Sequence, residues 1–172
     1  PCRPRSQLLT IAWPCDREEA VDVHGYSMVV FDLDGTLVDS TPDIALALNS
    51  ALVSSGGRPL AHHEIVPLIG EGPGALVDSA VTVAGLSGAD TGAITRAYLD
   101  GYRSRPVVES VLYPGVLEAL HRLAAANVTM AVCTNKAEAI AGVVLDRLGI
   151  GQFFITVVGG DRITRRKPEP EH

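Results

Sequence analysis

The amino-acid sequence predicts an α/β fold, a parallel β-sheet with an inserted helical cap, and three observations carry this prediction. Apolar runs of strand-forming residues cover 28–31, 128–133 and 153–158, as expected of strands buried in a parallel sheet. Helical patterns separate the later runs, which gives the strand–helix alternation of α/β proteins. Between the first run and the helix expected near Gly115, residues 41–110 show only helical patterning. A segment of this length exceeds a simple crossover, so we expect it to form a cap.

The helical segments are recognised by their ends. Thr41 is expected to cap the first helix, with Pro42 at its first position, and the helix ends before a glycine pair at 56–57. We therefore expect a Rossmannoid core from residues 28–40 and 111–172, with the cap at 41–110. The other helical patterns, separated by glycine or proline, cover residues 73–83, 91–102, 115–125 and 137–148.

Composition and charge bound the possible functions. With 172 residues, 47% of them hydrophobic and 20% charged, the chain is expected to fold around one ordinary core as a soluble protein. The formal net charge of −6 argues against nucleic-acid binding, which needs clustered lysine and arginine. No apolar run reaches the roughly 18 residues that a membrane-spanning helix needs. The cysteines lack the spacing of a zinc site or a disulfide framework, which favours a cytoplasmic protein. The sequence leaves the oligomeric state open.

Residues 1–27 differ in character from the rest of the chain. Arginines and a short apolar stretch resemble a signal peptide, but Pro14 interrupts the stretch and an acidic cluster that begins at Asp16 follows it. We therefore predict a disordered or loosely attached extension rather than an export signal.

Two carboxylates, Asp32 and Asp34, follow the first apolar run at positions i and i+2. At this spacing they leave the strand on the same side and can converge on one ligand at the carboxyl edge of the sheet. One carboxylate could attack a phosphorus atom while the other protonates the leaving oxygen and then activates water. Gly35 would permit a tight turn that directs backbone N–H groups toward phosphoryl oxygens. The plainer alternative is a loop with surface carboxylates.

Three segments in order along the chain carry a resemblance to a known family. The DLDGT run that begins at Asp32, the pair Thr134–Asn135 after the second strand, and Lys167 resemble motifs I, II and III of the haloacid dehalogenase superfamily. The glycine-bearing segment 69–73 is most similar to the cap loop of the phosphoglycolate phosphatases in that superfamily.

The resemblance implies a site for phosphoryl transfer. Asp32 would be the nucleophile, Asp34 the general acid and base, and Lys167 would neutralise charge on the phosphoryl group. Mg²⁺ would be held by a carboxylate oxygen of Asp32 and by the backbone carbonyl of Asp34. Helix capping by the pair Thr134–Asn135 and a solvated position for Lys167 are the alternatives. The residues expected to bind the substrate are Gly35, Thr36, Thr134, Asn135, Gly70 and Gly72.

Other polar or reactive side chains near these motifs are expected to be structural. Asp39 and Asp161 are interpreted as residues that order loops. Cys133 is interpreted as a buried strand residue, because no base stands ready to activate its thiol.

The function that the resemblance implies is a phosphatase that hydrolyses a small phosphorylated metabolite, 2-phosphoglycolate by analogy with the family, through an aspartyl-phosphate. A phosphomutase of the same superfamily is the nearest enzymatic alternative. The family's fourth motif supplies a further metal carboxylate and lies beyond the third, whereas this sequence ends at His172. A catalytically incomplete fragment or a non-enzymatic binding module is therefore the alternative of a different class. In that case we expect poor magnesium binding and an open edge on the first strand.

Overall fold

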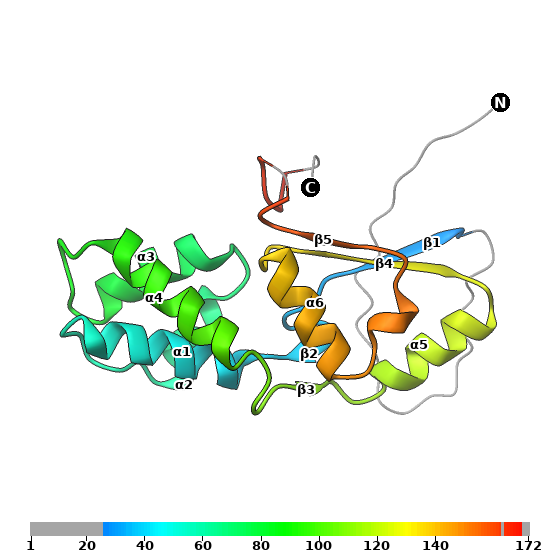
Figure 1. The fold of residues 1–172 in the computed structure, drawn as a ribbon, viewed down its shortest axis with the longest axis horizontal. Helices are drawn as coiled ribbons and strands as arrows, with labels where there is room; N and C mark the ends of the chain where they lie inside the picture. Colours follow the sequence, from blue (N-terminus) through cyan, green and yellow to red (C-terminus); the bar gives the residue numbers. More distant parts are fainter. Residues whose placement is uncertain (1–25, 163, 170–172) are drawn as a thin grey trace.

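The computed structural model describes residues 26–162 and 164–169 (Figure 1). The extension predicted for residues 1–27 falls, up to residue 25, outside the described part of the chain. In Figure 1, four helices lie together at one end of the molecule, and a small sheet with two further helices lies at the other.

The sheet consists of three parallel strands in the order β1-β4-β5, formed by Met28–Phe31, Thr129–Thr134 and Val157–Gly159. The register pairs Phe31 with Val132 and Thr134 with Gly159. Because parallel strands end at the same edge, the residues that follow β1 and β4 are brought together there. The predicted α/β fold with a parallel sheet is confirmed.

Helices α5 (Val116–Ala125) and α6 (Glu138–Arg147) lie on one face of this sheet (Figure 1). Strand β5 packs closely on α6, because a Cβ atom added at Gly159 would meet the backbone of Glu138. Gly159 also donates its backbone N–H to Glu138 Oε2 at 3.3 Å. The glycine is therefore required by the close approach of strand and helix.

Strand β5 begins later than the sequence predicts. The apolar run was expected to form a strand over 153–158, but the short 3₁₀ helix η2 (Gly151–Phe153) occupies its start. Phe153 packs edge-on against His121, and Phe154 packs edge-on against Phe31. These side chains therefore pack from the 3₁₀ helix and the residue that follows it rather than from a strand.

A two-stranded antiparallel ribbon joins the sheet to the helices. It pairs β2 (Val38–Asp39) with β3 (Val111–Leu112). Strand β2 leads directly into the first helix of the helical end, which begins at Thr41, and β3 follows the last helix of that end, which ends at Ser104. The sequence did not predict this ribbon, because two residues are too few to show an alternating pattern.

The helical layer contains α1 (Thr41–Ser54), α2 (His62–Ile65), η1 (Val66–Leu68), α3 (Pro73–Val83) and α4 (Thr91–Ser104). The long helices agree with the predicted segments, whereas the short α2 and η1 were not predicted. That this layer is a separate cap domain stays a prediction.

Helix α1 begins one residue earlier than expected. Ser40, not Thr41, is its N-cap residue, and the Ser40 side chain makes no capping hydrogen bond. Instead, Asp39 Oδ1 accepts the Thr41 backbone N–H at 3.3 Å. The Ser40 hydroxyl is used elsewhere, as described below.

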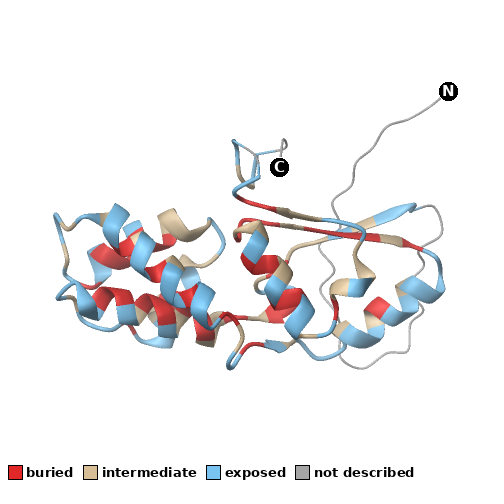
Figure 2. Cartoon of the chain, in the orientation of Figure 1, coloured by how far each residue is buried: buried red, intermediate tan, exposed pale blue. Residues whose placement is uncertain are grey.

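The helical layer and the sheet with its two helices both have apolar interiors (Figure 2). Leu48 and Leu52 of α1 are fully buried among the helices, and Leu120 and Val132 are fully buried beside the sheet. Strand β1 is an edge strand of the described sheet, and its Met28 and Val30 side chains are 45% and 49% exposed. Among the described residues, no helix has the length and apolarity needed to cross a membrane.

Candidate active site

The loop after β1 presents two carboxylates on either side of a buried anchor. Leu33 is fully buried between Asp32 and Asp34, which are both partly exposed. Gly35 has φ of +80°, and its N–H donates to the Val38 carbonyl at 2.9 Å. The left-handed backbone suits glycine, so the turn holds the two carboxylates on the same side of the loop.

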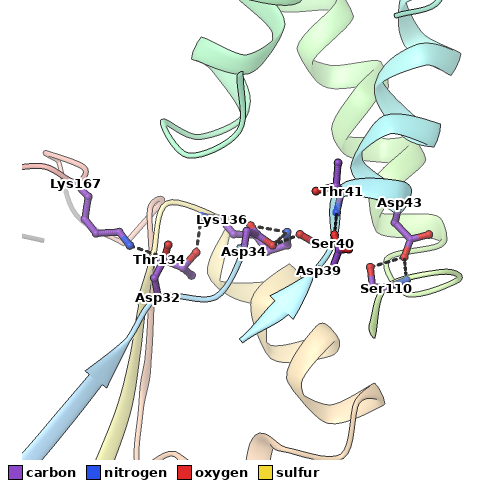
Figure 3. A network of polar contacts seen from close by, with 10 residues as sticks. All are labelled: Asp32, Asp34, Asp39, Ser40, Thr41, Asp43, Ser110, Thr134, Lys136 and Lys167. Atoms are coloured by element: carbon purple, nitrogen blue, oxygen red, sulfur yellow. Dashed lines mark hydrogen bonds and ion pairs between the residues drawn. The ribbon is translucent and has the colours of Figure 1, made fainter. Parts of the chain in front are cut away.

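Two side chains hold the Asp34 carboxylate (Figure 3). Lys136 Nζ donates to both of its oxygens, at 2.8 and 2.9 Å. The Ser40 hydroxyl donates to Oδ1 at 2.5 Å. The Lys136 side chain is only 6% exposed, and its ammonium lies 4.7 Å from the centre of the Tyr102 ring, within the range of a cation–π contact.

Asp32 has a separate cation (Figure 3). Lys167 Nζ donates to Asp32 Oδ1 at 2.6 Å and to the Cys133 carbonyl at 2.9 Å. Burial raises the pKa of the Cys133 thiol, Lys167 lowers it and Asp32 raises it, and the pKa stays above its usual value. A thiol held in its protonated form is a poor nucleophile, which favours the structural interpretation of Cys133.

Asp32 and Asp34 line a cavity between the sheet edge and the helical layer, about 540 Å³ including space open to solvent. The sheet side contributes Thr134, Asn135 and Lys136 beside the two carboxylates. The helical side contributes Ile44, Ile69, Gly70, Gly72, Leu76, Tyr98, Leu99 and Tyr102.

The structure therefore brings six of the predicted site residues to one cavity: Asp32, Asp34, Thr134, Asn135, Gly70 and Gly72. Lys167 reaches it through its ion pair with Asp32. Gly35 and Thr36 are exposed in the turn and are not part of the lining. Their N–H groups donate to the Val38 and Leu33 carbonyls, and contact of these two residues with a substrate stays a prediction.

Two tyrosines of α4 line the cavity. The rings of Tyr98 and Tyr102 are stacked with centroids 6.0 Å apart. Burial raises the pKa of both phenols, so both are neutral at physiological pH. The Tyr102 hydroxyl is buried without a hydrogen-bond partner among the described residues. The cavity lining thus combines charged groups from the sheet side with aromatic rings from the helical side.

The side chains of Thr134 and Asn135, expected to bind the substrate, make hydrogen bonds within the protein. Thr134 is 1% exposed, and its Oγ1 accepts the Lys136 backbone N–H at 3.2 Å. The Asn135 side chain donates to the Gly70 carbonyl at 2.7 Å and accepts the Lys167 backbone N–H at 3.0 Å. Its amide is engaged by the protein itself.

A buried carboxylate outside the cavity lies where the chain passes between the sheet and the helical layer (Figure 3). Asp43, at the start of α1, is 2% exposed and accepts the backbone N–H groups of Val108, Glu109 and Ser110 at 2.9 to 3.2 Å. The Ser110 hydroxyl donates to it as well, at 2.5 Å. One side chain therefore ties the segment that enters the helical layer to the segment that leaves it.

Sequence analysis gave no role to Lys136, Ser40 or Asp43. Ser40 and Lys136 lie in the sequence segments that resemble motifs I and II. Their place in these segments could have marked them as candidate site residues. Nothing local marks Asp43, because its partners are 65 to 67 residues away along the chain. Asp39 and Asp161 order backbone as predicted: Asp39 accepts from Thr41, and Asp161 accepts the Glu138 N–H at 2.8 Å.

The donors present suit a hard cation in kind. Asp32 and Asp34 offer carboxylate oxygens, and the Asp34 backbone carbonyl is a further oxygen ligand of the type that Mg²⁺ prefers. The described residues contain no group of three or more histidine, cysteine, aspartate or glutamate side chains that could hold a metal.

A loop with two carboxylates, each paired with a lysine at the edge of a parallel sheet and facing a helical layer, defines the class of this protein. The family model of the haloacid dehalogenase-like hydrolases matches residues 29–172, and the chain belongs to this family.

Within this family, the chain is similar to phosphoglycolate phosphatases. The chain is 40% identical over 148 residues to the phosphoglycolate phosphatase of Rhodospirillum rubrum and 35% identical over 147 residues to that of Agrobacterium fabrum. These matches cover 83% and 84% of this chain but 61% and 63% of the relatives, so the chain spans less than two thirds of their length. A crystal structure from Haemophilus somnus, described as a predicted phosphoglycolate phosphatase, superposes with a TM-score of 0.78 at 32% identity, covering 85% of this chain and 68% of that one.

Proposed function

We propose that this protein is a Mg²⁺-dependent phosphatase that hydrolyses a small phosphomonoester, with 2-phosphoglycolate as its substrate. The single observation that carries the proposal is the pairing of the two loop carboxylates with two different lysines. Lys167 lies 2.6 Å from Asp32, and Lys136 lies 2.8 Å from Asp34. The two carboxylates are thus held in different surroundings, as two different chemical roles require.

In this proposal, an Asp32 carboxylate oxygen attacks phosphorus and the bond from phosphorus to the alcohol oxygen breaks. Asp34 delivers a proton to that oxygen, and later takes a proton from the water that attacks the aspartyl-phosphate and releases inorganic phosphate. Lys167 offsets the negative charge that Asp32 and the phosphoryl group bring together.

Asp32 and the Asp34 backbone carbonyl would hold Mg²⁺. Once bound, the metal would neutralise phosphoryl charge and so reduce its repulsion by the nucleophile. The oxygen chemistry of the donors supports this role.

The substrate is proposed from the relatives, because both relatives named above, at 35% and 40% identity, are phosphoglycolate phosphatases. The cavity that Asp32 and Asp34 line is partly open to solvent, so a small substrate could reach both carboxylates.

The test measures phosphate release from 2-phosphoglycolate with millimolar Mg²⁺ by the purified protein and two variants. Asp32→Asn should show no turnover and no phosphoenzyme, because an amide does not attack phosphorus. Asp34→Asn should lose about 10² to 10⁴ in rate, the usual contribution of proton transfer. Near-normal rates in either variant would contradict the proposal, and transfer of the phosphoryl group to a sugar hydroxyl would indicate a mutase.

A further inference from the structure

Asn135 joins the two layers of the molecule through a single side-chain amide. Its Nδ2 group donates to the Gly70 carbonyl at 2.7 Å and to the Lys167 carbonyl at 3.2 Å. Its Oδ1 atom accepts the Lys167 backbone N–H at 3.0 Å. One contact is with the loop of the helical layer, and two are with the backbone of the lysine that pairs with Asp32.

This amide has one orientation that satisfies all of its neighbours. Exchanging Nδ2 and Oδ1 would place an acceptor against two carbonyls and a donor against an N–H group. Asn135 is also 6% exposed, so losing these bonds would leave buried polar groups unpaired. The amide is therefore a fixed link.

Both polar groups of the Lys167 backbone end on Asn135. The Lys167 side chain then extends to Asp32, where Nζ donates at 2.6 Å. The position of Nζ relative to the nucleophile depends on where this backbone is held. Asn135 acts on Asp32 only through Lys167, since no direct contact between the two side chains is present among the described residues.

The loop from the helical layer approaches Asn135 without room for a side chain. A Cβ atom added at Gly72 would lie 3.3 Å from the Asn135 carbonyl oxygen and 2.8 Å from Arg166 Nη1. Arg166 in turn donates from Nε to the Gly160 carbonyl at 2.8 Å. The segment 70–72 therefore rests directly on the end of β4 and on the segment that carries Lys167.

We propose that Asn135 is a positioning residue that couples seating of the cap loop at Gly70–Gly72 to the placement of Lys167 beside Asp32. When the loop is seated, the Gly70 carbonyl holds the Asn135 amide, and the amide holds the Lys167 backbone. When the loop lifts, the amide loses one of its three bonds and the lysine is less firmly held. The catalytic consequence rests on the proposed phosphatase function, whereas the coupling itself does not.

The test is hydrogen–deuterium exchange of the whole protein, read in the peptides that contain residues 69–73 and Lys167. Gly72→Ala perturbs the loop from the cap side and leaves the Asn135 side chain unchanged. Its backbone φ of +91° also disfavours alanine. We expect exchange to rise in both peptides by at least about fivefold, the effect of one ordinary hydrogen bond. In an Asn135→Ala background, the same Gly72→Ala change should add nothing at Lys167.

Two matched variants control for general loosening. Gly74→Ala changes a neighbouring glycine whose added Cβ would meet no atom within 4 Å. Asn49→Ala removes an amide of the same kind, which bridges the N–H and carbonyl of Leu60 within the helical layer at 2.7 and 2.9 Å. Neither should change exchange at Lys167.

Two results would overturn the inference. Gly72→Ala could raise exchange at 69–73 alone, or it could raise exchange at Lys167 equally with and without Asn135, which would assign the coupling to Arg166. Activity gives an independent reading, since Asn135→Ala should lower kcat about tenfold in the wild-type chain and less than about twofold in Lys167→Ala. Full activity in Lys167→Ala would overturn the proposed function, and the exchange result would still decide the coupling.

Discussion

At the scale of single residues, the site is built from two acids and the only two lysines in the sequence. All other cations of the chain are arginines or histidines. Lys136 and Lys167 each end on one carboxylate of the loop after β1. A compact ammonium with three donors can serve a carboxylate and a second group at once, and both lysines do so here.

Lys136→Met should slow turnover while the protein stays folded. The substitution removes both Nζ contacts to Asp34 and leaves Ser40 as the donor to that carboxylate. Because proton transfer depends on a well-placed group, we expect kcat for 2-phosphoglycolate to fall about tenfold to a hundredfold. Arg103→Met, which removes a cation that is 56% exposed and paired with exposed Asp100, is the control and should keep the wild-type rate. Unchanged kcat in Lys136→Met would mean that Ser40 alone orients Asp34.

The two lysines also predict a pattern of chemical modification. The Lys167 side chain is 32% exposed and the Lys136 side chain is 6% exposed, so an amine-acylating reagent should modify Lys167 first. Acetylation removes the ammonium charge, and loss of activity should follow the loss of unmodified Lys167 in peptide mass spectra. Inorganic phosphate should slow both processes together, and modification of Lys136 ahead of Lys167 would contradict this order.

Residues of the site could be predicted from the sequence where the motif itself supplies them. Asp32, Asp34 and Lys167 lie in recognisable runs, and the structure brings them together. The role of Asn135 could not be predicted, because a substrate-binding amide and an amide that holds Lys167 and Gly70 have the same local sequence. Long-range contacts decide between them.

At the scale of elements, the packing of β5 on α6 gives a matched pair of glycine substitutions. Gly159→Ala places a methyl group against the Glu138 backbone, and overpacking of this kind costs about 1–3 kcal/mol. Gly142→Ala lies inside α6, where the added Cβ meets no atom within 4 Å, and should stabilise the helix by about 0.5–1 kcal/mol. Chemical denaturation of both variants measures the two signs, and equal effects would show that β5 can move away from α6 without cost.

Long patterned elements were predicted well, and short ones were not. The bounds of β1 and α3 agree with the sequence patterns at 28–31 and 73–83. The ribbon of β2 and β3 carries no periodic signal, since each strand has two residues. The start of β5 was wrong for a different reason: the apolar residues before it are in the 3₁₀ helix η2 or directly follow it, and Phe154 packs edge-on against Phe31 from that position.

At the scale of the whole molecule, Asp43 fixes the crossing between the two layers. Burial raises the pKa of its carboxyl. The hydroxyl of Ser110 and three backbone N–H groups together lower this pKa by more than burial raises it, so the pKa lies below its usual value. A carboxyl whose pKa is lower in the folded state stabilises the fold above its unfolded pKa, and this contribution is lost as pH falls through the folded value.

Asp43→Asn should therefore destabilise the protein most at neutral pH. An amide accepts through one oxygen and cannot serve all four donors, and we expect a loss of about 2–3 kcal/mol at pH 7. The difference from wild type should shrink as pH falls below about 4, where the Asp43 carboxyl of the unfolded chain becomes protonated, and should be lost below the lower pKa of the folded state. Asp100→Asn, at a side chain 75% exposed, is the control, and thermal denaturation across pH gives both curves. A difference that stays constant down to pH 3 would show that the charge of Asp43 is not responsible.

The connectivity of the two ion pairs has a consequence for how the site comes into being during synthesis. Asp34 and Lys136 are 102 residues apart in the chain, and Asp32 and Lys167 are 135 residues apart. A ribosome that adds residues from the N-terminus delivers both acids early and both ammonium groups late. Such distant pairings raise contact order and slow the steps that close them. The nascent helical layer can form from contacts among its own neighbouring helices. At that stage Asp32 and Asp34 are solvated and have no lysine partner. The two ion pairs of the site can thus form only after the helical layer between their partners has been synthesised.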